Sequence, residues 1–214
     1  MLIAVPYFGA DERFKRLLTY WFELHAASRT EVQAIVITDE QPPNGFPALR
    51  VDTSGYWSVI RQKDGQPHPW DRKGAIVAAS LSILGPFLSC DVDAFIQRDP
   101  EPWMAKLGAM PISARADGWQ RTVLGARQIN AGVMWFGDMK MRAIVENEYL
   151  IAFGELAPEY AEDEWREQLA WSLVFHRAKM PALPAELNWS HHVEGIERAA
   201  IVHEHGPTKW KRIQ

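Results

Sequence analysis

Short apolar runs alternate with helical patterns in the first part of the chain. Residues 2–8 form an apolar run that stops at Gly9, and residues 34–38 form a second one. Between them, apolar residues recur at helical spacing over residues 11–28, which predicts an amphipathic helix with Asp11 as its N-cap. A strand, a helix and a strand at this spacing are typical of an α/β sheet with a right-handed crossover.

The alternation continues to the end of the chain. Residues 54–69 are rich in glycine and proline and are predicted to form a loop. Helices are predicted at residues 70–84, 100–107, 139–153 and 163–175. Further strands are predicted before Asp91-Val92-Asp93, at residues 109–114, after Asn130 and Gly132, and at residues 199–202. We therefore expect an α/β fold with a mixed, mostly parallel central sheet flanked by helices, in a single domain spanning residues 1–214.

Composition and charge narrow the class of protein. The chain has 214 residues, of which 47% are hydrophobic, so it can bury a full core. Its formal net charge of -4 leaves no basic surplus, and no nucleic-acid partner is expected. Cys90 is the only cysteine, which excludes an internal disulfide and indicates packing. The aliphatic stretch at residues 1–5 is short, ends at Pro6 and contains no basic residue, so we expect no signal peptide, no membrane span and a cytoplasmic location.

Asp91-Val92-Asp93 is the stretch with the clearest chemistry. If the segment is extended, Asp91 and Asp93 point to one side of the strand and Val92 to the other. Two carboxylates so placed repel each other unless a cation lies between them, which favours a divalent metal that also holds an anionic ligand. The alternative interpretation is a solvated turn that contains two aspartates.

Other candidate residues follow strands of the predicted sheet. Ligands of open α/β sheets bind beyond the carboxyl ends of the strands, so Pro6, Tyr7, Phe8 and Asp39 are predicted to line a nucleotide pocket. No glycine-rich phosphate loop follows the first strand, which argues against a dinucleotide fingerprint or a P-loop. The small residues around Asn130 let a ligand approach the backbone closely, although a turn before a strand would explain them equally well.

Five segments in this order resemble motifs of the GT-A class of nucleotide-sugar-dependent glycosyltransferases. The similarity is closest to glycosyltransferase family 8, the glycogenin and bacterial galactosyltransferase relatives. The segments are Asp91-Val92-Asp93, Asn130-Ala131-Gly132-Val133, Glu167-Gln168, Leu183-Pro184 to Asn188, and His203-x-x-Gly206-x-x-Lys209, with Asp117-Gly118-Trp119 as a loop before the second. Two departures stand out: Glu167 replaces the aspartate of the family, and Trp210 stands where a proline is usual.

The resemblance implies a GT-A catalytic domain that transfers a sugar from a UDP-sugar with retention of configuration. Residues 1–93 would bind the nucleotide, and residues 94–214 would hold the donor sugar, the acceptor and a metal and phosphate motif. The resemblance implies Mn²⁺, or else Mg²⁺, on Asp91, Asp93 and His203, with Lys209 and Gly206 at the diphosphate. It places Lys73 near the sugar or phosphate and assigns the donor hydroxyls to Asn130, Glu167 and Gln168. It also makes Glu167, near the anomeric carbon, and Gln168 the candidate catalytic residues. The remaining donor-binding residues that it implies are Val92, Ala131, Gly132 and Asn188.

Two other functions remain open at this stage. The chain could be a nucleotide-sugar binding module with little or no turnover, or a sugar nucleotidylyltransferase, although the glycine-rich signature of the latter is missing. Three histidines offer a separate hypothesis, an adventitious zinc site at His191, His192 and His205. For a transferase the acceptor stays open among saccharides, lipid-linked sugars and proteins.

Overall fold

The structure is a computed structural model in which most of the chain is described. The described residues are 1–9, 11–43, 45–60, 68–108, 112–116, 122–160, 163, 165–190, 194–204 and 209–211. Several residues singled out in the sequence lie outside these ranges: Asp117-Gly118-Trp119, His191, His192, His205 and Gly206.

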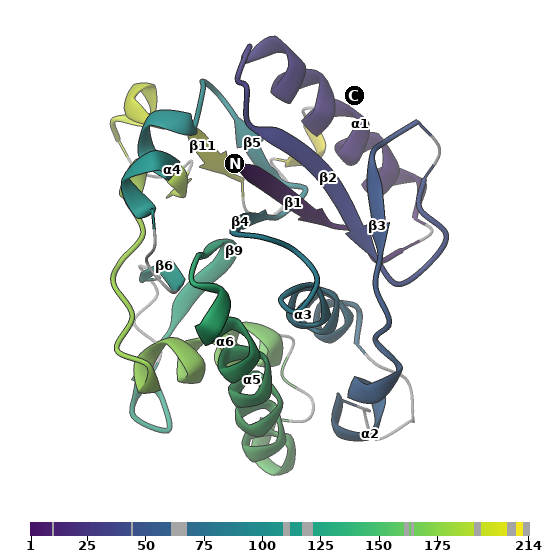
Figure 1. The fold of residues 1–214 in the computed structure, drawn as a ribbon, viewed down its shortest axis with the longest axis vertical. Coiled ribbons are helices and arrows are strands. Elements are labelled where there is room, and N and C mark those ends of the chain that lie inside the picture. The colour runs from purple at the N-terminus through teal and green to yellow at the C-terminus, as the bar shows by residue number, and fades with distance from the viewer. Residues whose placement is uncertain are drawn as a thin grey trace.

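A six-stranded sheet forms the centre of the molecule, in the order β3-β2-β1-β4-β9-β6 (Figure 1). Its strands are β1 (Leu2–Pro6), β2 (Gln33–Thr38), β3 (Ala48–Arg50), β4 (Phe87–Cys90), β6 (Ile112–Ala116) and β9 (Ile129–Phe136). Strands β3, β2, β1 and β4 run parallel, whereas β9 is antiparallel to both of its neighbours. The predicted fold class, a mixed and mostly parallel sheet, is confirmed.

Helices cover both faces of this sheet. Helix α1 (Glu12–Ala27) lies on one face, and the other face carries α3 (Pro69–Ser80), α5 (Met139–Tyr160) and α6 (Arg166–Arg177) (Figure 1). Alternate residues of β9 serve the two cores, as the two-residue repeat of a strand requires. Val133 and Trp135 pack into the core on the α1 side, and Met134 and Phe136 pack against the other helices. Strand β9 is therefore held by packing on both of its faces.

Shorter elements complete the described chain and carry its end to the sheet. They are α2 (Trp57–Ile60), α4 (Glu101–Leu107), β5 (Ala94–Ile96), β7 (Thr122–Val123), β8 (Ala126–Arg127), β10 (Trp189–Ser190), β11 (Ile201–His203), and 3-10 turns at Ser54–Tyr56, Ala185–Leu187 and Ile196–Arg198. Strand β11 is antiparallel to β5 and pairs His203 with Ala94. The amide of Glu204 then donates to the carbonyl of Asp93 over 3.0 Å. This small sheet brings the last strand beside the aspartates.

Helix α1 is fixed to the second sheet by a buried tryptophan. Trp21 is fully buried, and its indole Nε1 donates to the carbonyl oxygen of Ala94 over 2.8 Å. Its replacement by alanine would cost about 3–5 kcal/mol of stability.

Among the described residues, no helix is both long and apolar enough to cross a membrane.

Several element boundaries differ from the sequence prediction. Residues 54–60 are helical rather than loop, because Tyr56 and Ile60 turn into the core. Helix α3 ends at Ser80 instead of residue 84, where the amide of Leu84 bonds back to the Ser80 carbonyl over 2.9 Å in a turn. Helix α5 continues to Tyr160, beyond the predicted residue 153.

Candidate active site

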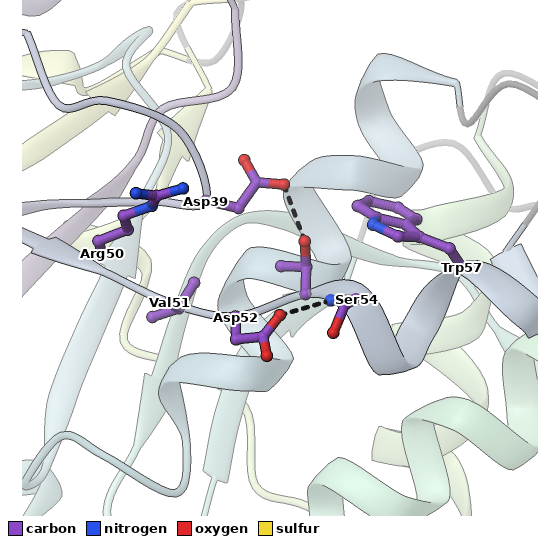
Figure 2. A pocket seen from close by; sticks show the side chains of 7 residues that line it. Asp39, Arg50, Val51, Asp52, Ser54 and Trp57 are labelled. Carbon is purple, nitrogen blue, oxygen red and sulfur yellow. Dashed lines mark hydrogen bonds between the residues drawn. The ribbon is translucent and has the colours of Figure 1, made fainter.

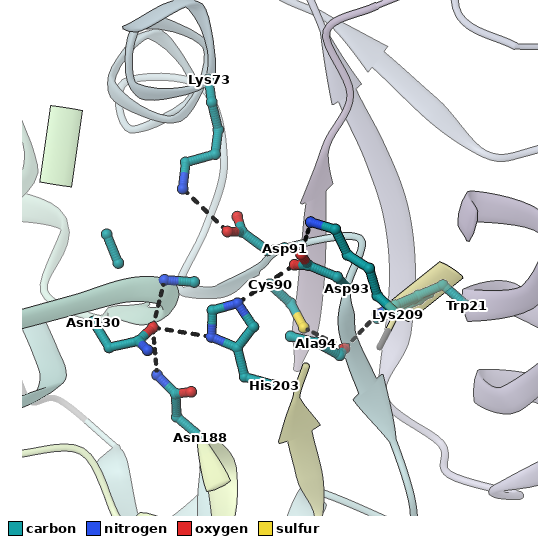
Figure 3. Close-up of polar contacts among 12 residues, drawn as sticks. Trp21, Lys73, Cys90, Asp91, Asp93, Ala94, Asn130, Asn188, His203 and Lys209 are labelled. Carbon is teal, nitrogen blue, oxygen red and sulfur yellow. Dashed lines mark hydrogen bonds and ion pairs between the residues drawn. The ribbon is translucent and has the colours of Figure 1, made fainter. Parts of the chain in front are cut away.

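The two aspartates lie on a tight turn at the carboxyl end of β4. The amide of Asp91 donates to the carbonyl of Gly132 over 2.7 Å, and the amide of Ala94 donates to the Asp91 carbonyl over 2.9 Å. The segment is therefore a turn between β4 and β5 rather than the extended stretch considered from the sequence. The two carboxylates nevertheless point to one place, because ligand atoms of Asp91, Asp93 and His203 all lie within 4.8 Å of one another (Figure 3).

His203 is held between Asp93 and strand β9. Its Nε2 lies 3.4 Å from Asp93 Oδ1, and its Nδ1 lies 3.0 Å from Asn130 Oδ1. The ring rests against Gly132, where an added Cβ would collide with the imidazole. A side chain at position 132 would therefore displace the histidine. The group that lies close to the backbone at Gly132 is therefore the His203 ring.

Two lysines neutralise the aspartates from opposite sides. Lys73, from the first turns of α3, has its Nζ 3.1 Å from Asp91 Oδ2 and 3.4 Å from Glu167 Oε2. Lys209 has its Nζ 2.6 Å from Asp93 Oδ2. The two ammonium groups flank the turn in Figure 3. A lysine near a helix N-terminus opposes the helix dipole, and the two carboxylates explain why Lys73 is nevertheless retained there.

Burial and charge shift the pKa values of this cluster in different directions. Burial raises the pKa of Glu167 to about 7, although Lys73 acts against it. Burial also raises the pKa of Asp91, despite the same lysine. Burial alone would raise the pKa of Asp93 too, but His203 and Lys209 outweigh it and hold that pKa well below its usual range. Asp93 is therefore the carboxylate that stays ionised most firmly.

Glu167 has one carboxylate oxygen to spare. Its Oε2 faces Lys73, whereas its Oε1 is buried and accepts no hydrogen bond within the described part of the chain. The nearby Tyr149 hydroxyl is also buried without a hydrogen-bond partner there. Gly74 makes room for both side chains, since a Cβ at that position would collide with them. An unpartnered carboxylate oxygen is costly in a core, so Oε1 is a natural acceptor for a ligand hydroxyl.

Asn130 and Gly132 lie within β9 rather than before it, so the strand starts earlier than predicted and the alternative of a turn is excluded. The Asn130 Oδ1 accepts from three groups: the Gly132 amide (3.0 Å), Asn188 Nδ2 (3.3 Å) and His203 Nδ1 (3.0 Å). Gln168 Oε1 accepts from the Ala131 amide over 3.2 Å and so ties α6 to β9. The predicted donor-binding residues of three separate motifs thus contact one another directly.

A buried ion pair that sequence reasoning missed fixes Glu167 relative to Lys73. Asp71 of α3 bonds to Arg166 of α6, and both side chains are almost fully buried. Each lies close in sequence to a site residue, since Asp71 precedes Lys73 by two residues and Arg166 immediately precedes Glu167. No local pattern marks this pair, because its members are 95 residues apart. Breaking it would cost about 3–5 kcal/mol.

The end of the first strand leads into an aromatic cluster beside the lysines. Pro6 closes β1, and buried Tyr7 follows it. Phe8 then packs edge-on against Trp70, with ring centroids 5.7 Å apart. The Trp70 ring centroid lies 6.0 Å from Lys73 Nζ and 5.9 Å from Lys209 Nζ. Ring and ammonium groups at such distances attract each other. No sequence pattern had marked Trp70 as a site residue.

Asp39 lies at the carboxyl end of β2, but its carboxylate is already engaged. Arg72 binds both Asp39 oxygens, with Nε 3.0 Å from each, and Thr53 donates to Oδ2 over 2.9 Å. The same aspartate lines a cavity of about 480 Å³ (Figure 2). The other lining residues are Arg50, Val51, Asp52, Thr53, Ser54 and Trp57. A direct bond from Asp39 to a nucleotide would have to displace Arg72 or Thr53.

The donor set fits a divalent cation. Two carboxylates and one imidazole suit Mn²⁺, and the carboxylates alone suit Mg²⁺. The ring of His203 is seated against Gly132, so its Nε2 faces the aspartates rather than solvent. We conclude that Asp91, Asp93 and His203 are arranged as a metal site would require.

Comparison with solved structures identifies the fold. No protein-family profile and no curated protein sequence matches the chain. The galactosyltransferase LgtC, solved with donor and acceptor sugar analogs, matches with a TM-score of 0.61 at 16% identity over 97% of this chain and 88% of LgtC. The glycosyltransferase GlyE of Streptococcus pneumoniae TIGR4 matches with 0.62 at 12% identity, over 99% of this chain and 60% of GlyE.

A third structure is a glycosyltransferase involved in glycosylation of the major capsid of PBCV-1. It matches with a TM-score of 0.54 at 15% identity, over 99% of this chain and 96% of that protein. At these identities the likeness shows the fold, and the GT-A glycosyltransferase fold predicted from the motifs is confirmed.

Proposed function

We propose that the chain is a metal-dependent glycosyltransferase that moves a sugar from a nucleotide-diphosphate donor, a UDP-sugar, to an acceptor. Residues 1–93 would hold the nucleotide, and residues 94–214 would hold the donor sugar and the acceptor. The reaction would retain the anomeric configuration. The acceptor is a saccharide, a lipid-linked sugar or a protein.

One observation carries this proposal: three metal-ligand side chains from distant parts of the chain meet between two lysines. Asp91, Asp93 and His203 offer ligand atoms within 4.8 Å of one another. Lys73 and Lys209 lie against the two aspartates. Oxygen and nitrogen ligands beside fixed positive charges suit a metal-bound diphosphate, whose negative charge grows as its bond to the sugar breaks.

The bound metal would act as a Lewis acid at the leaving diphosphate. The residues of the chain would bind the phosphates and orient the sugar. Lys209 is a point charge that can turn from Asp93 to a phosphate oxygen. Lys73 is fixed between Asp91 and Glu167 and supplies a positive charge that does not move. The unpartnered Oε1 of Glu167 would accept from a donor hydroxyl and so orient the sugar.

Calorimetry with UDP tests the donor site. The wild-type protein should bind UDP in the presence of Mn²⁺ and much more weakly with a chelator. Asp93→Ala should remove the Mn²⁺-dependent part of the affinity, about 100-fold or more, because it deletes the carboxylate that stays ionised most firmly. The exposed Glu31→Ala serves as a control for the loss of a carboxylate and should bind like the wild type. UDP affinity that does not respond to Mn²⁺ in a folded sample would contradict the proposal.

Turnover separates the transferase from its alternatives. Incubation with a panel of UDP-sugars and Mn²⁺ should release UDP slowly by donor hydrolysis, and faster with a suitable acceptor. Saturable binding of UDP-sugars without release under any acceptor would favour a binding module. Formation of a UDP-sugar from UTP and a sugar phosphate, with release of pyrophosphate, would favour a nucleotidylyltransferase.

A further inference from the structure

The amide oxygen of Asn130 is the point at which three motifs meet. Its Oδ1 accepts from the Gly132 amide at 3.0 Å, from Asn188 Nδ2 at 3.3 Å and from His203 Nδ1 at 3.0 Å (Figure 3). Asn130 is buried, with 8% of its surface exposed, and so are Asn188 and His203. The contact with His203 joins residues that are 73 positions apart.

The Gly132 amide decides which end of the Asn130 side chain faces His203. A backbone N–H can only donate, so the atom of Asn130 that it contacts must be the oxygen. Because the same oxygen lies 3.0 Å from His203 Nδ1, that nitrogen must carry a proton in order to bond to it. In the neutral ring, Nε2 is then the unprotonated nitrogen. Nε2 is also the atom that faces Asp93 at 3.4 Å.

We propose that Asn130 is a positioning residue that fixes the Nδ1–H tautomer of His203 and thereby leaves Nε2 free to bind the metal ion. The inference rests on the proposed function, because it gives His203 a role at the metal. It differs from the role that the family resemblance implies for Asn130, which is binding of donor hydroxyls. Three donors already occupy the Asn130 oxygen, so any contact with the donor sugar must come from the other end of the amide.

Gly132 and Asn188 hold the arrangement together. Gly132 supplies the amide that orients Asn130, and its lack of a Cβ leaves space for the His203 ring. Asn188 bonds to the same oxygen from the turn that precedes β10. Hydrogen bonds to the ring nitrogen that does not bind the metal orient metal-binding histidines, and their loss typically lowers metal affinity by about 10–100-fold.

The tautomer can be read directly by long-range ¹H–¹⁵N spectroscopy of the metal-free protein with ring-labelled histidine. At about pH 8.5, His203 should show a proton on Nδ1, the nitrogen that contacts the Asn130 oxygen. His203→Gln assigns its signals. His25 is an internal control with the opposite expectation, because its Nε2 lies 2.8 Å from the carbonyl oxygen of Val32 and must donate to it. An Nε2–H tautomer at His203 in the wild type would overturn the inference.

Variants at position 130 connect the tautomer to metal binding. Asn130→Ala should release His203 to a mixture of tautomers and should weaken Mn²⁺ binding in the presence of UDP, followed by electron paramagnetic resonance, about 10–100-fold. Asn130→Asp keeps an acceptor oxygen and should preserve both the Nδ1–H tautomer and most of the affinity. The His25 signals should stay unchanged in both variants.

The proposed function and the positioning role of Asn130 are contradicted by different results. A wild-type protein that binds no Mn²⁺ with UDP contradicts the proposed function. If the wild type binds Mn²⁺ and UDP but Asn130→Ala changes neither tautomer nor affinity, only the role of Asn130 is refuted. A merely structural Asn130 would lower stability in both variants without this selective effect on His203.

Discussion

The turn that carries Asp91 and Asp93 has a lysine on each side, and the two lysines are held very differently. Lys73 stems from a helix packed in the core and lies between two carboxylates, those of Asp91 and Glu167. Lys209 comes from a short turn near the end of the chain and meets the single carboxylate of Asp93. Their side chains are 6% and 12% exposed.

This difference separates a structural charge from an exchangeable one. Removing Lys73 would leave two acids buried with reduced compensation, because both depend on its ammonium group. Removing Lys209 would leave one acid that still faces His203. A divalent cation would also need Asp93, so the ammonium of Lys209 and the cation compete for one carboxylate. We expect the Lys73 side to set stability and the Lys209 side to respond to ligand.

The largest effect is expected on stability from Lys73→Met. It should lower the free energy of unfolding at pH 7 by about 3–5 kcal/mol, because it uncouples a buried network. Lys209→Met, the matched variant on the other side of the turn, should cost less, because Asp93 still faces His203. Urea denaturation in the presence of a chelator measures both. Equal losses in the two variants would remove the distinction between the lysines.

Glu167 makes the Lys73 side sensitive to pH. Burial raises its pKa from 4.5 to about 7, so its protonated form is favoured in the folded protein. The stability that this contributes is complete below pH 4.5 and is lost as the pH rises through about 7. Glu167→Gln cannot titrate, so its stability relative to the wild type should improve between about pH 5 and pH 8 by up to about 3 kcal/mol.

Denaturation of the metal-free protein at several pH values tests this expectation. The exposed Glu31→Gln serves as the control, and its difference from the wild type should stay constant across the same range. A Glu167→Gln variant whose advantage does not grow with pH would show that Glu167 is already ionised in the folded protein.

Local patterns predicted the elements near the site better than the contacts within it. The apolar runs over residues 2–8 and 34–38 became β1 and β2, because a buried parallel strand must be continuously apolar. Asn130 and Gly132 were predicted to precede a strand, either beside a ligand or in a turn, yet both lie inside β9. The reason is tertiary, since Gly132 makes room for His203, which no local pattern reveals.

Local sequence patterns likewise did not predict which residues the charged groups contact. The resemblance placed Lys73 near the sugar or phosphate, but no local pattern predicted its two carboxylates, Asp91 after β4 and Glu167 in α6. The motif resemblance brought the right residues together as a set. It did not show that the oxygen of Asn130 faces His203, because side-chain direction depends on the packed fold.

Lys209→Met should have opposite effects on two ligands. Affinity for Mn²⁺ alone should rise several-fold, since the ammonium no longer occupies Asp93. Affinity for UDP in the presence of Mn²⁺ should fall about tenfold, because a cationic contact to phosphate is lost. Calorimetric titration gives both values, and Lys211→Met, an exposed lysine two residues away, is the control. Changes of the same sign for both ligands would contradict competition at Asp93.

The smallest effect concerns Trp70, whose ring lies at nearly equal distances from the two ammonium groups, 6.0 Å for Lys73 and 5.9 Å for Lys209. Ring–ammonium attraction is worth about 0.5–1 kcal/mol at exposed sites and about 2 kcal/mol when water is excluded. Double-mutant cycles of Trp70→Leu with each lysine variant measure the two couplings in the free energy of unfolding. Since Lys73 is the more buried, its coupling to Trp70 should be the larger, although the distances match. A larger coupling for Lys209 would mean that the Lys73 ammonium is better hydrated than its burial implies.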